Sequence, residues 1–214
     1  FIQKMVTEMS SKINSSADLS NGIIDELTDL VEAPSAFIGT FDKSYLDLPP
    51  EVLSTVMRVH QRYIPLYIDK SEKDILALDS KNILFPNFLC ITNTLAKTID
   101  LVRSGNERVL RARFSDAKFF IESDLAISSN KRCEKLKKVS FSEGLGSLFD
   151  RVQRIQWITD KLTNLIDVLD MNKSEVLNAS RLCKHDLVSN MVGEFPELQG
   201  VIGAKYLLKE GHSK

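Results

Sequence analysis

The sequence is poor in cysteine and tryptophan. Its 214 residues include one tryptophan and three cysteines, Cys90, Cys133 and Cys183, which lie far apart and show no CxxC spacing. An odd number of scattered cysteines does not favour a disulfide framework. We therefore expect reduced thiols, as in a cytosolic protein.

Long hydrophobic runs are also absent. No apolar stretch approaches the roughly 20 residues that a membrane span needs, and the first residues lack the basic-then-apolar order of a signal peptide. We expect a cytoplasmic protein that does not contact a membrane. The chain starts at Phe1 and ends in the polar segment Lys209–Lys214, so we also expect a piece cut from a longer protein.

The common phosphate-binding and nucleophile motifs are missing. There is no GxxxxGK[ST] loop, no GxGxxG turn after a strand, and no serine or cysteine in a recognisable nucleophile elbow. The sequence therefore predicts no catalytic residue, no cofactor site and no metal site in this chain.

The composition is that of a folded protein with balanced charge. Hydrophobic residues make up 43% of the chain, enough for one large domain or two modest ones. The formal net charge is only -1, so any contact with nucleic acid must come from a local basic patch.

Hydrophobic patterning predicts an α+β fold with a mixed first part and a helical second part. Short runs rich in β-branched and aromatic residues predict strands at 36–41, 63–68 and 88–92. Pro49-Pro50 and the spacing of Val52, Val56 and Val59 predict a helix over 51–60. After residue 98 no strand signal remains.

Three helices are predicted in the second half of the chain. A capping-box pattern, Ser104-Gly-Asn-Glu107, predicts a helix from about Gly105 to Ser123. A long amphipathic helix is predicted from the apolar repeat of Leu148, Val152, Ile155, Ile158, Leu162, Leu165 and Leu169. A third helix, capped near Asn172 or Ser174 and ended by Gly193 and Pro196, carries an inward stripe of Val176, Cys183, Leu187 and Met191.

Two basic clusters are candidates for RNA binding. Between residues 103 and 118, five cations face two carboxylates, a net charge of +3, and between 131 and 138 five cations face one, a net charge of +4. Cations along a helix can neutralise phosphates. The candidates are Arg103, Arg108, Arg111, Lys118, Lys135, Lys137 and Lys138. On charge alone, an ordinary solvated helix face remains the preferred interpretation.

Other polar and aromatic residues are interpreted as structural. Arg113 falls within the apolar arc of its helix, which favours a tie to a carboxylate over an RNA contact. The pair Phe119-Phe120 and Trp157 lie in apolar helical patterns, so we expect them in the core rather than stacked on bases.

The pair His185-Asp186 resembles the motif of the HD phosphohydrolases, in which such a pair helps to hold a metal. A catalytic divalent site needs about three protein ligands, and neither His60 nor His212 is an obvious companion. On the helical wheel His185 points away from the apolar stripe. We therefore expect a surface or helix-capping histidine in a degenerate HD pair.

Several segments together resemble one enzyme family, the beta subunit of bacterial glycyl-tRNA synthetase. The strongest are Gly105-Asn-Glu-Arg-Val-Leu-Arg-Ala-Arg113 and Lys184-His-Asp-Leu-Val-Ser-Asn-Met-Val-Gly-Glu-Phe-Pro-Glu-Leu-Gln-Gly200. Further support comes from 48–53, 60–63, 116–120, 134–139 and 145–148.

The resemblance implies a role and a domain plan. It implies an α2β2 ligase whose alpha subunit holds ATP, Mg and glycine, and a beta subunit that positions tRNA(Gly); no DNA partner is implied. It also implies an α+β region over 1–125, similar to part of the phenylalanyl-tRNA synthetase beta chain. Residues 126–214 would then begin a helical HD-like domain, with Ser142 where a first HD histidine is expected.

Two other functions stay open on the sequence. One is an HD-type metal-dependent phosphohydrolase, suggested by His185-Asp186. The other is a scaffold that holds the alpha subunit without touching RNA.

Overall fold

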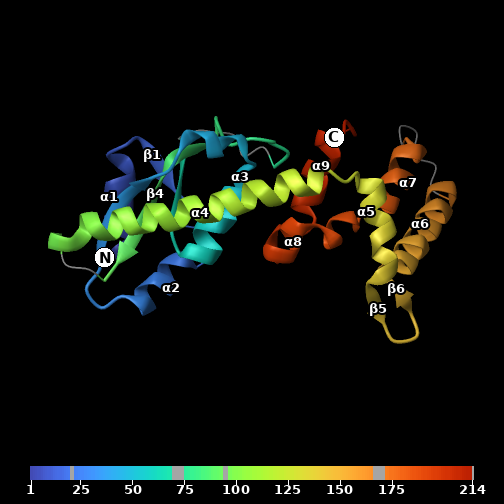
Figure 1. Cartoon of the computed structure of the whole chain (residues 1–214), viewed down its shortest axis with the longest axis horizontal. Helices are drawn as coiled ribbons and strands as arrows, with labels where there is room; N and C mark the ends of the chain where they lie inside the picture. The colour runs from blue at the N-terminus through green and yellow to red at the C-terminus, as the bar shows by residue number, and fades with distance from the viewer. Residues whose placement is uncertain (20–21, 69–74, 94–95, 166–171, 214) are drawn as a thin grey trace. The chain divides into compact units, whose positions relative to one another are not determined.

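The computed structural model describes residues 1–19, 22–68, 75–93, 96–165 and 172–213 (Figure 1). The chain forms two compact units, unit 1 over Phe1–Phe119 and unit 2 over Phe120–Lys214. A small antiparallel sheet in unit 1 and helices in both units confirm the α+β class. The expected domain border at residue 125 stays a prediction.

Unit 1 is built on a four-stranded antiparallel sheet with the strand order β1-β3-β4-β2. The strands are β1 (Ser15–Ala17), β2 (Ser35–Thr40), β3 (Ile64–Ile68) and β4 (Leu84–Thr92). The three predicted strands are confirmed. The short edge strand β1 was not predicted, because three residues of serine and alanine carry no hydrophobic alternation.

Two helices cover one face of the sheet. The helices α1 (Ile2–Ser11) and α2 (Ile23–Leu30) bury Val6 and Leu27 against Leu66 and Leu89 of the central strands. Successive strand residues point to opposite faces, so Phe88 faces the other side, where it stacks on Tyr63 with ring centroids 4.6 Å apart.

The helix α4 (Ile99–Leu125) is the longest in the chain and appears as the green helix crossing the sheet in Figure 1. It buries Leu110, Phe114, Ala117 and Ile121 at helical spacing. The predicted start at Gly105 was wrong. The helix begins at Ile99, and Ser104 lies inside it, while Glu107 accepts hydrogen bonds from the backbone N–H and hydroxyl of Thr40.

The connection between β2 and β3 contains a broken helix. It runs through a 3-10 turn (Lys43–Asp47), the helix α3 (Pro50–Thr55) and a π-helical turn (Val56–His60). This confirms the helical prediction over 51–60. Val52, Val56 and Met57 are fully buried.

Unit 2 consists of the last turns of α4, five further α-helices, 3-10 turns and a hairpin within the residues that the structure describes. The α-helices are α5 (Ser129–Lys135), α6 (Leu148–Leu165), α7 (Lys173–Leu182), α8 (Asn190–Glu194) and α9 (Val201–Lys209). The 3-10 turns are Leu136–Lys138, His185–Val188 and Pro196–Leu198. None of the helices in the described residues has the length and hydrophobicity that a membrane span requires.

The prediction of an all-helical second region was wrong in one place. The strands β5 (Ser140–Ser142) and β6 (Gly146–Ser147) pair as a small hairpin. Gly144 and Gly146 adopt positive φ angles of 71° and 77°, which lets the chain turn within a few residues. A hairpin this short leaves no alternating pattern in the sequence.

The predicted helices of unit 2 are only partly confirmed. Helix α6 follows the predicted repeat, although Leu169 lies outside the described residues. Asn172 caps α7 as expected, accepting hydrogen bonds from the backbone of Ser174 and Glu175. The single helix predicted up to Gly193 was wrong, because α7 ends at Leu182 and a 3-10 turn precedes α8.

Three residues expected in the interior are exposed instead. Phe119 is 63% exposed and Trp157 is 64% exposed, and Arg113 is also exposed. Phe120 is half-buried and packs edge-on against Phe195, as a core interpretation requires. A helical repeat locates an apolar stripe but does not say whether another element covers it.

We predict that Gly39→Ala destabilises unit 1, whereas Gly105→Ala does not. A Cβ atom at residue 39 would lie 2.4 Å from the ring of Phe88, which is fully buried and cannot move aside. Overpacking of this kind costs about 1–3 kcal/mol. Residue 105 lies in the second turn of α4 with no atom within 4 Å of a new Cβ, so alanine there should leave the free energy of unfolding unchanged or raise it by up to about 1 kcal/mol. Urea denaturation of both variants measures the difference; equal stability would contradict the packing described here.

Candidate functional site

The exposed cations of α4 form the first candidate site. Arg108, Arg111 and Lys118 lie within about 80° of one another around the helix, over a length of about 15 Å. All three side chains are exposed, and none of them makes an ion pair with a described residue. The charge of Arg111 contributes to lowering the pKa of Asp42, after the hydrogen bonds from Ser44.

Arg103, the remaining candidate in α4, is engaged within unit 1. It pairs with Asp100 at 3.0 Å and lies over the ring of Phe37, with its Cζ 5.8 Å from the ring centroid. Its side chain is 39% exposed. Arg103 therefore has less freedom to meet a ligand than the other three cations.

The second basic cluster lies in unit 2 and is divided by the fold. Lys135 and Lys138 are exposed, whereas Lys137 forms an ion pair with Glu134 and lies over the ring of Phe149. Arg132, which contributes to the net charge of the cluster, is 1% exposed. The basic surface of this segment is thus smaller than its sequence suggests.

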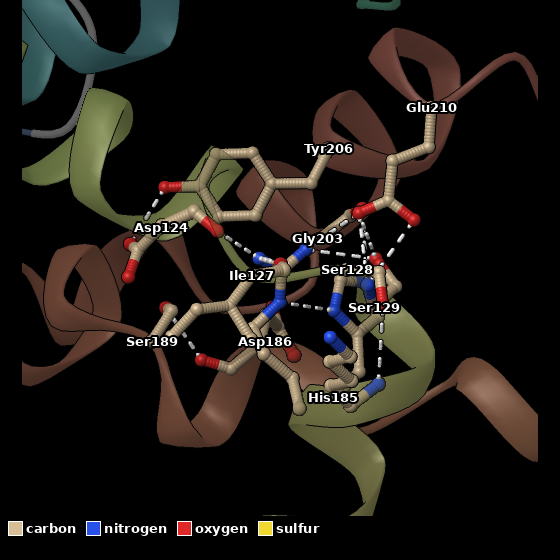
Figure 2. A network of polar contacts seen from close by, with 12 residues as sticks. Asp124, Ile127, Ser128, Ser129, His185, Asp186, Ser189, Gly203, Tyr206 and Glu210 are labelled. Carbon is tan, nitrogen blue, oxygen red and sulfur yellow. Dashed lines mark hydrogen bonds and ion pairs between the residues drawn. The ribbon is translucent and has the colours of Figure 1, made fainter.

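Buried Arg132 is the centre of a polar network in unit 2. Figure 2 labels its partners Asp124, Ile127, Ser129, His185 and Glu210. A guanidinium has five N–H donors. Nε donates to Nδ1 of His185 at 3.2 Å, and Nη1 donates to the carbonyls of Asp124 and Ile127. Nη2 donates to Oγ of Ser129 at 2.8 Å and to Oε1 of Glu210 at 3.1 Å. Each donor has an acceptor, and the ring of Tyr206 covers the guanidinium 4.8 Å away.

His185 belongs to this network, so the expectation of a surface histidine was wrong. Its side chain is 1% exposed. Nδ1 accepts from Arg132, which leaves the proton on Nε2, 3.1 Å from the carbonyl oxygen of Gly203. Burial, and then the charge of Arg132, lower the pKa of His185. The wheel failed because His185 lies in a 3-10 turn beyond the end of α7.

Asp186 is also buried and has a structural partner. Its Oδ2 accepts a hydrogen bond of 2.5 Å from the backbone N–H of Gly200, which precedes the first turn of α9. Helix N-termini favour a carboxylate. A Cβ at residue 203 would lie 2.9 Å from the Asp186 carboxyl group, so only glycine lets α9 approach this side chain.

Asp124 and Glu210 are the other two acids of the network. Asp124 accepts from the backbone N–H groups of Asn190 and Met191, at 2.8 and 3.0 Å, and from the hydroxyl of Tyr206 at 2.8 Å. Burial and this neighbouring carboxylate raise the pKa of Tyr206. Glu210 accepts from the backbone N–H and hydroxyl of Ser129 at the start of α5. Both carboxylates therefore bind helix N-termini.

The site residues do not fit a catalytic metal. Both ring nitrogens of His185 already have partners, and the lone pair of Nδ1 faces a guanidinium. Among the described residues, no group of three or more His, Cys, Asp or Glu side chains could hold a metal ion. The HD pair is used here to join elements of the fold.

Sequence comparison identifies the family to which these two units belong. A family model described as "Glycyl-tRNA synthetase beta subunit" matches residues 1–214. The chain belongs to the glycyl-tRNA synthetase beta subunit family.

Individual relatives agree with this assignment. The chain is 39% identical over 210 residues to a glycine–tRNA ligase beta subunit of Listeria welshimeri. The matched residues make up 98% of this chain and 29% of the relative. It is 38% identical to that of a Synechocystis species, over 99% of this chain and 28% of the relative. The beta subunit of Streptococcus agalactiae is 39% identical, and the match covers 98% of this chain and 29% of the relative. The chain thus spans less than a third of the length of these curated relatives.

The network contains residues that the sequence prediction missed. They are Asp124, Ser129, Arg132, Gly203, Tyr206 and Glu210. One signal was available for Arg132, because it lies beside Cys133 and one helical turn before Leu136, which are both buried. The others come from segments up to 82 residues apart and share no local pattern.

We predict that Arg132→Ala lowers the stability of unit 2 by about 3–5 kcal/mol, the usual loss when one partner of a buried ion pair is removed. The substitution leaves Glu210 without its cation and removes the side-chain donor to the carbonyls of Asp124 and Ile127. Lys131→Ala, at the exposed neighbouring position of α5, should change stability by less than about 0.5 kcal/mol. Urea denaturation followed by circular dichroism compares the two. Similar unfolding midpoints would show that the network is not important for stability.

The lowered pKa of His185 predicts a pH dependence of stability. Below the ordinary pKa of 6.5, the unfolded chain binds a proton at this residue that the folded chain resists. Stability should therefore fall as pH drops below 6.5, by up to about 1.4 kcal/mol per pH unit. His185→Gln should be less stable at neutral pH but should lose less on acidification. Denaturation curves between pH 7.5 and 5 test this; parallel losses in the two proteins would contradict it.

Proposed function

We propose that this chain is part of a beta subunit that helps to bind and position tRNA(Gly) for a glycine–tRNA ligase. The relatives carry the name of this enzyme's beta subunit. In the proposed α2β2 enzyme the alpha subunit is the partner, binds ATP and Mg, and attaches glycine to tRNA in the cytoplasm. The described part of this chain contributes binding surface.

The observation that supports RNA binding is the free cationic face of α4. Arg108, Arg111 and Lys118 are exposed and lack ion pairs with described residues, while the protein as a whole is close to neutral. Glu107 lies on the same face, but its carboxylate accepts hydrogen bonds from Thr40 and not from these cations. Cations held on a helix can contact phosphates without reading the sequence. Lys135 and Lys138 offer a smaller second surface in unit 2.

The phosphohydrolase alternative has no support from the geometry. Such an enzyme needs metal ligands with free lone pairs and an open coordination position. His185 and Asp186 are buried, and their polar atoms are bound to Arg132, Gly203 and Gly200. We therefore propose that catalysis does not occur at the HD pair.

The proposal predicts that charge reversal on α4 weakens tRNA binding. Arg108→Glu, Arg111→Glu and Lys118→Glu together should reduce the affinity of the full-length beta subunit for tRNA(Gly) by on the order of tenfold or more. The slope of log K against log salt concentration should fall by about 2–3, because each lost phosphate contact releases fewer counterions. Filter binding between 50 and 200 mM salt measures both quantities.

A charge-matched control separates local from global effects. Lys4 of α1, Lys12 at its end and Lys209 of α9 are exposed and do not belong to α4, so reversing them changes the net charge equally. This control should keep most of the affinity and the salt slope. If both triple variants bind tRNA as the unmodified protein does, the remaining candidate is a scaffold for the alpha subunit, and co-purification of the two subunits without tRNA would then support it.

A further inference from the structure

The exposed side of the second half of α6 is apolar. Trp157 is 64% exposed, Ile158 and Leu162 are each 49% exposed, and Leu165 is 81% exposed. Single exposed apolar residues are common on protein surfaces, but these four lie within nine residues of one helix. Such a stripe favours an element that covers it.

The inner face of the same half of α6 is polar. Gln156, Thr159 and Thr163 are half-buried on the side of the helix that also carries buried Val152. Asp160, at the edge of this side, forms an ion pair with Lys173 at the start of α7. A helix that only had to bury one apolar stripe against α7 would have the opposite arrangement. The stripe on the outer face therefore has a different role from packing against α7.

The outer stripe has a definite shape and charge. On a helical wheel Ile158, Leu162 and Leu165 fall within about 60°, with the exposed cations Arg154 and Lys161 beside them and Trp157 beyond. The complement of this surface is an amphipathic helix whose apolar residues are flanked by carboxylates.

We propose that the α6 stripe is the docking site for an amphipathic helix from the remainder of the same family-length polypeptide. The curated relatives match this chain over only 28–29% of their length, so most of such a polypeptide lies outside the residues described here. The aliphatic part of the stripe, Ile158, Leu162 and Leu165, has no group that pairs with phosphates or stacks on bases, so an apolar partner suits it better than RNA. The proposal is independent of tRNA binding by α4.

Cysteine labelling in a full-length beta subunit that carries these residues tests the proposal. Leu162→Cys and Gln153→Cys both introduce a thiol at a position exposed in this structure, on opposite sides of α6. Cys183→Ser removes the exposed native thiol, while Cys90 and Cys133 are buried. Maleimide modification is followed by peptide-resolved mass spectrometry, on the isolated beta subunit without tRNA or alpha subunit.

We expect the thiol introduced by Leu162→Cys to react at least tenfold more slowly than the thiol introduced by Gln153→Cys, because the docked helix covers it. A second pair of variants gives an independent readout, since Leu162→Asp should lower the melting temperature of the full-length protein and Gln153→Asp should not. Equal labelling rates in a folded protein would overturn the proposal. Protection that needs the alpha subunit, tRNA or a high protein concentration would also overturn it, and would assign the stripe to that other partner.

Discussion

The buried guanidinium of Arg132 is the interaction on which unit 2 depends. A charged group removed from water requires a complete set of partners, and this one has an acceptor for each of its five N–H donors and a carboxylate to balance its charge. Those partners come from the end of α4, the start of α5, the 3-10 turn at His185 and the last turn of α9. One side chain thus joins four segments, which are also linked to one another by the hydrogen bonds of Asp124, Asp186 and Glu210.

The carboxylates of unit 2 follow the same principle. Asp124, Asp186 and Glu210 each accept backbone N–H groups at or just before the start of a helix, α8, α9 and α5 in turn. Those groups have no partner within their own helices, and a negative charge is favourable there. The adjacent pair His185-Asp186 is therefore explained by its contacts with Arg132, Gly203 and Gly200 and needs no metal. In this chain the cation facing the histidine is an arginine, which cannot activate water.

The sequence predicted those features that depend on local periodicity. The three longer strands, the helix α6 and the Asn172 cap of α7 were found because hydrophobic spacing and capping residues act over a few positions. The start of α4 was missed because Ser104 is equally compatible with a cap and with a helix interior. The burial of Arg132 and His185 and the exposure of Trp157 depend on which distant element lies opposite, and no local pattern contains that information.

The sequence separation within the network sets the order in which unit 2 can assemble. Arg132 and His185 are 53 residues apart, Ser129 and Glu210 are 81 apart, and Asp124 and Tyr206 are 82 apart. Contacts this distant require closure of large loops before they give any stabilisation, which slows folding. During synthesis on the ribosome, Arg132 therefore stays in contact with water until α9 has left the exit tunnel and can supply Tyr206 and Glu210. The sheet of unit 1 pairs residues up to 57 apart but does not include α9, so it can form while unit 2 is still being synthesised.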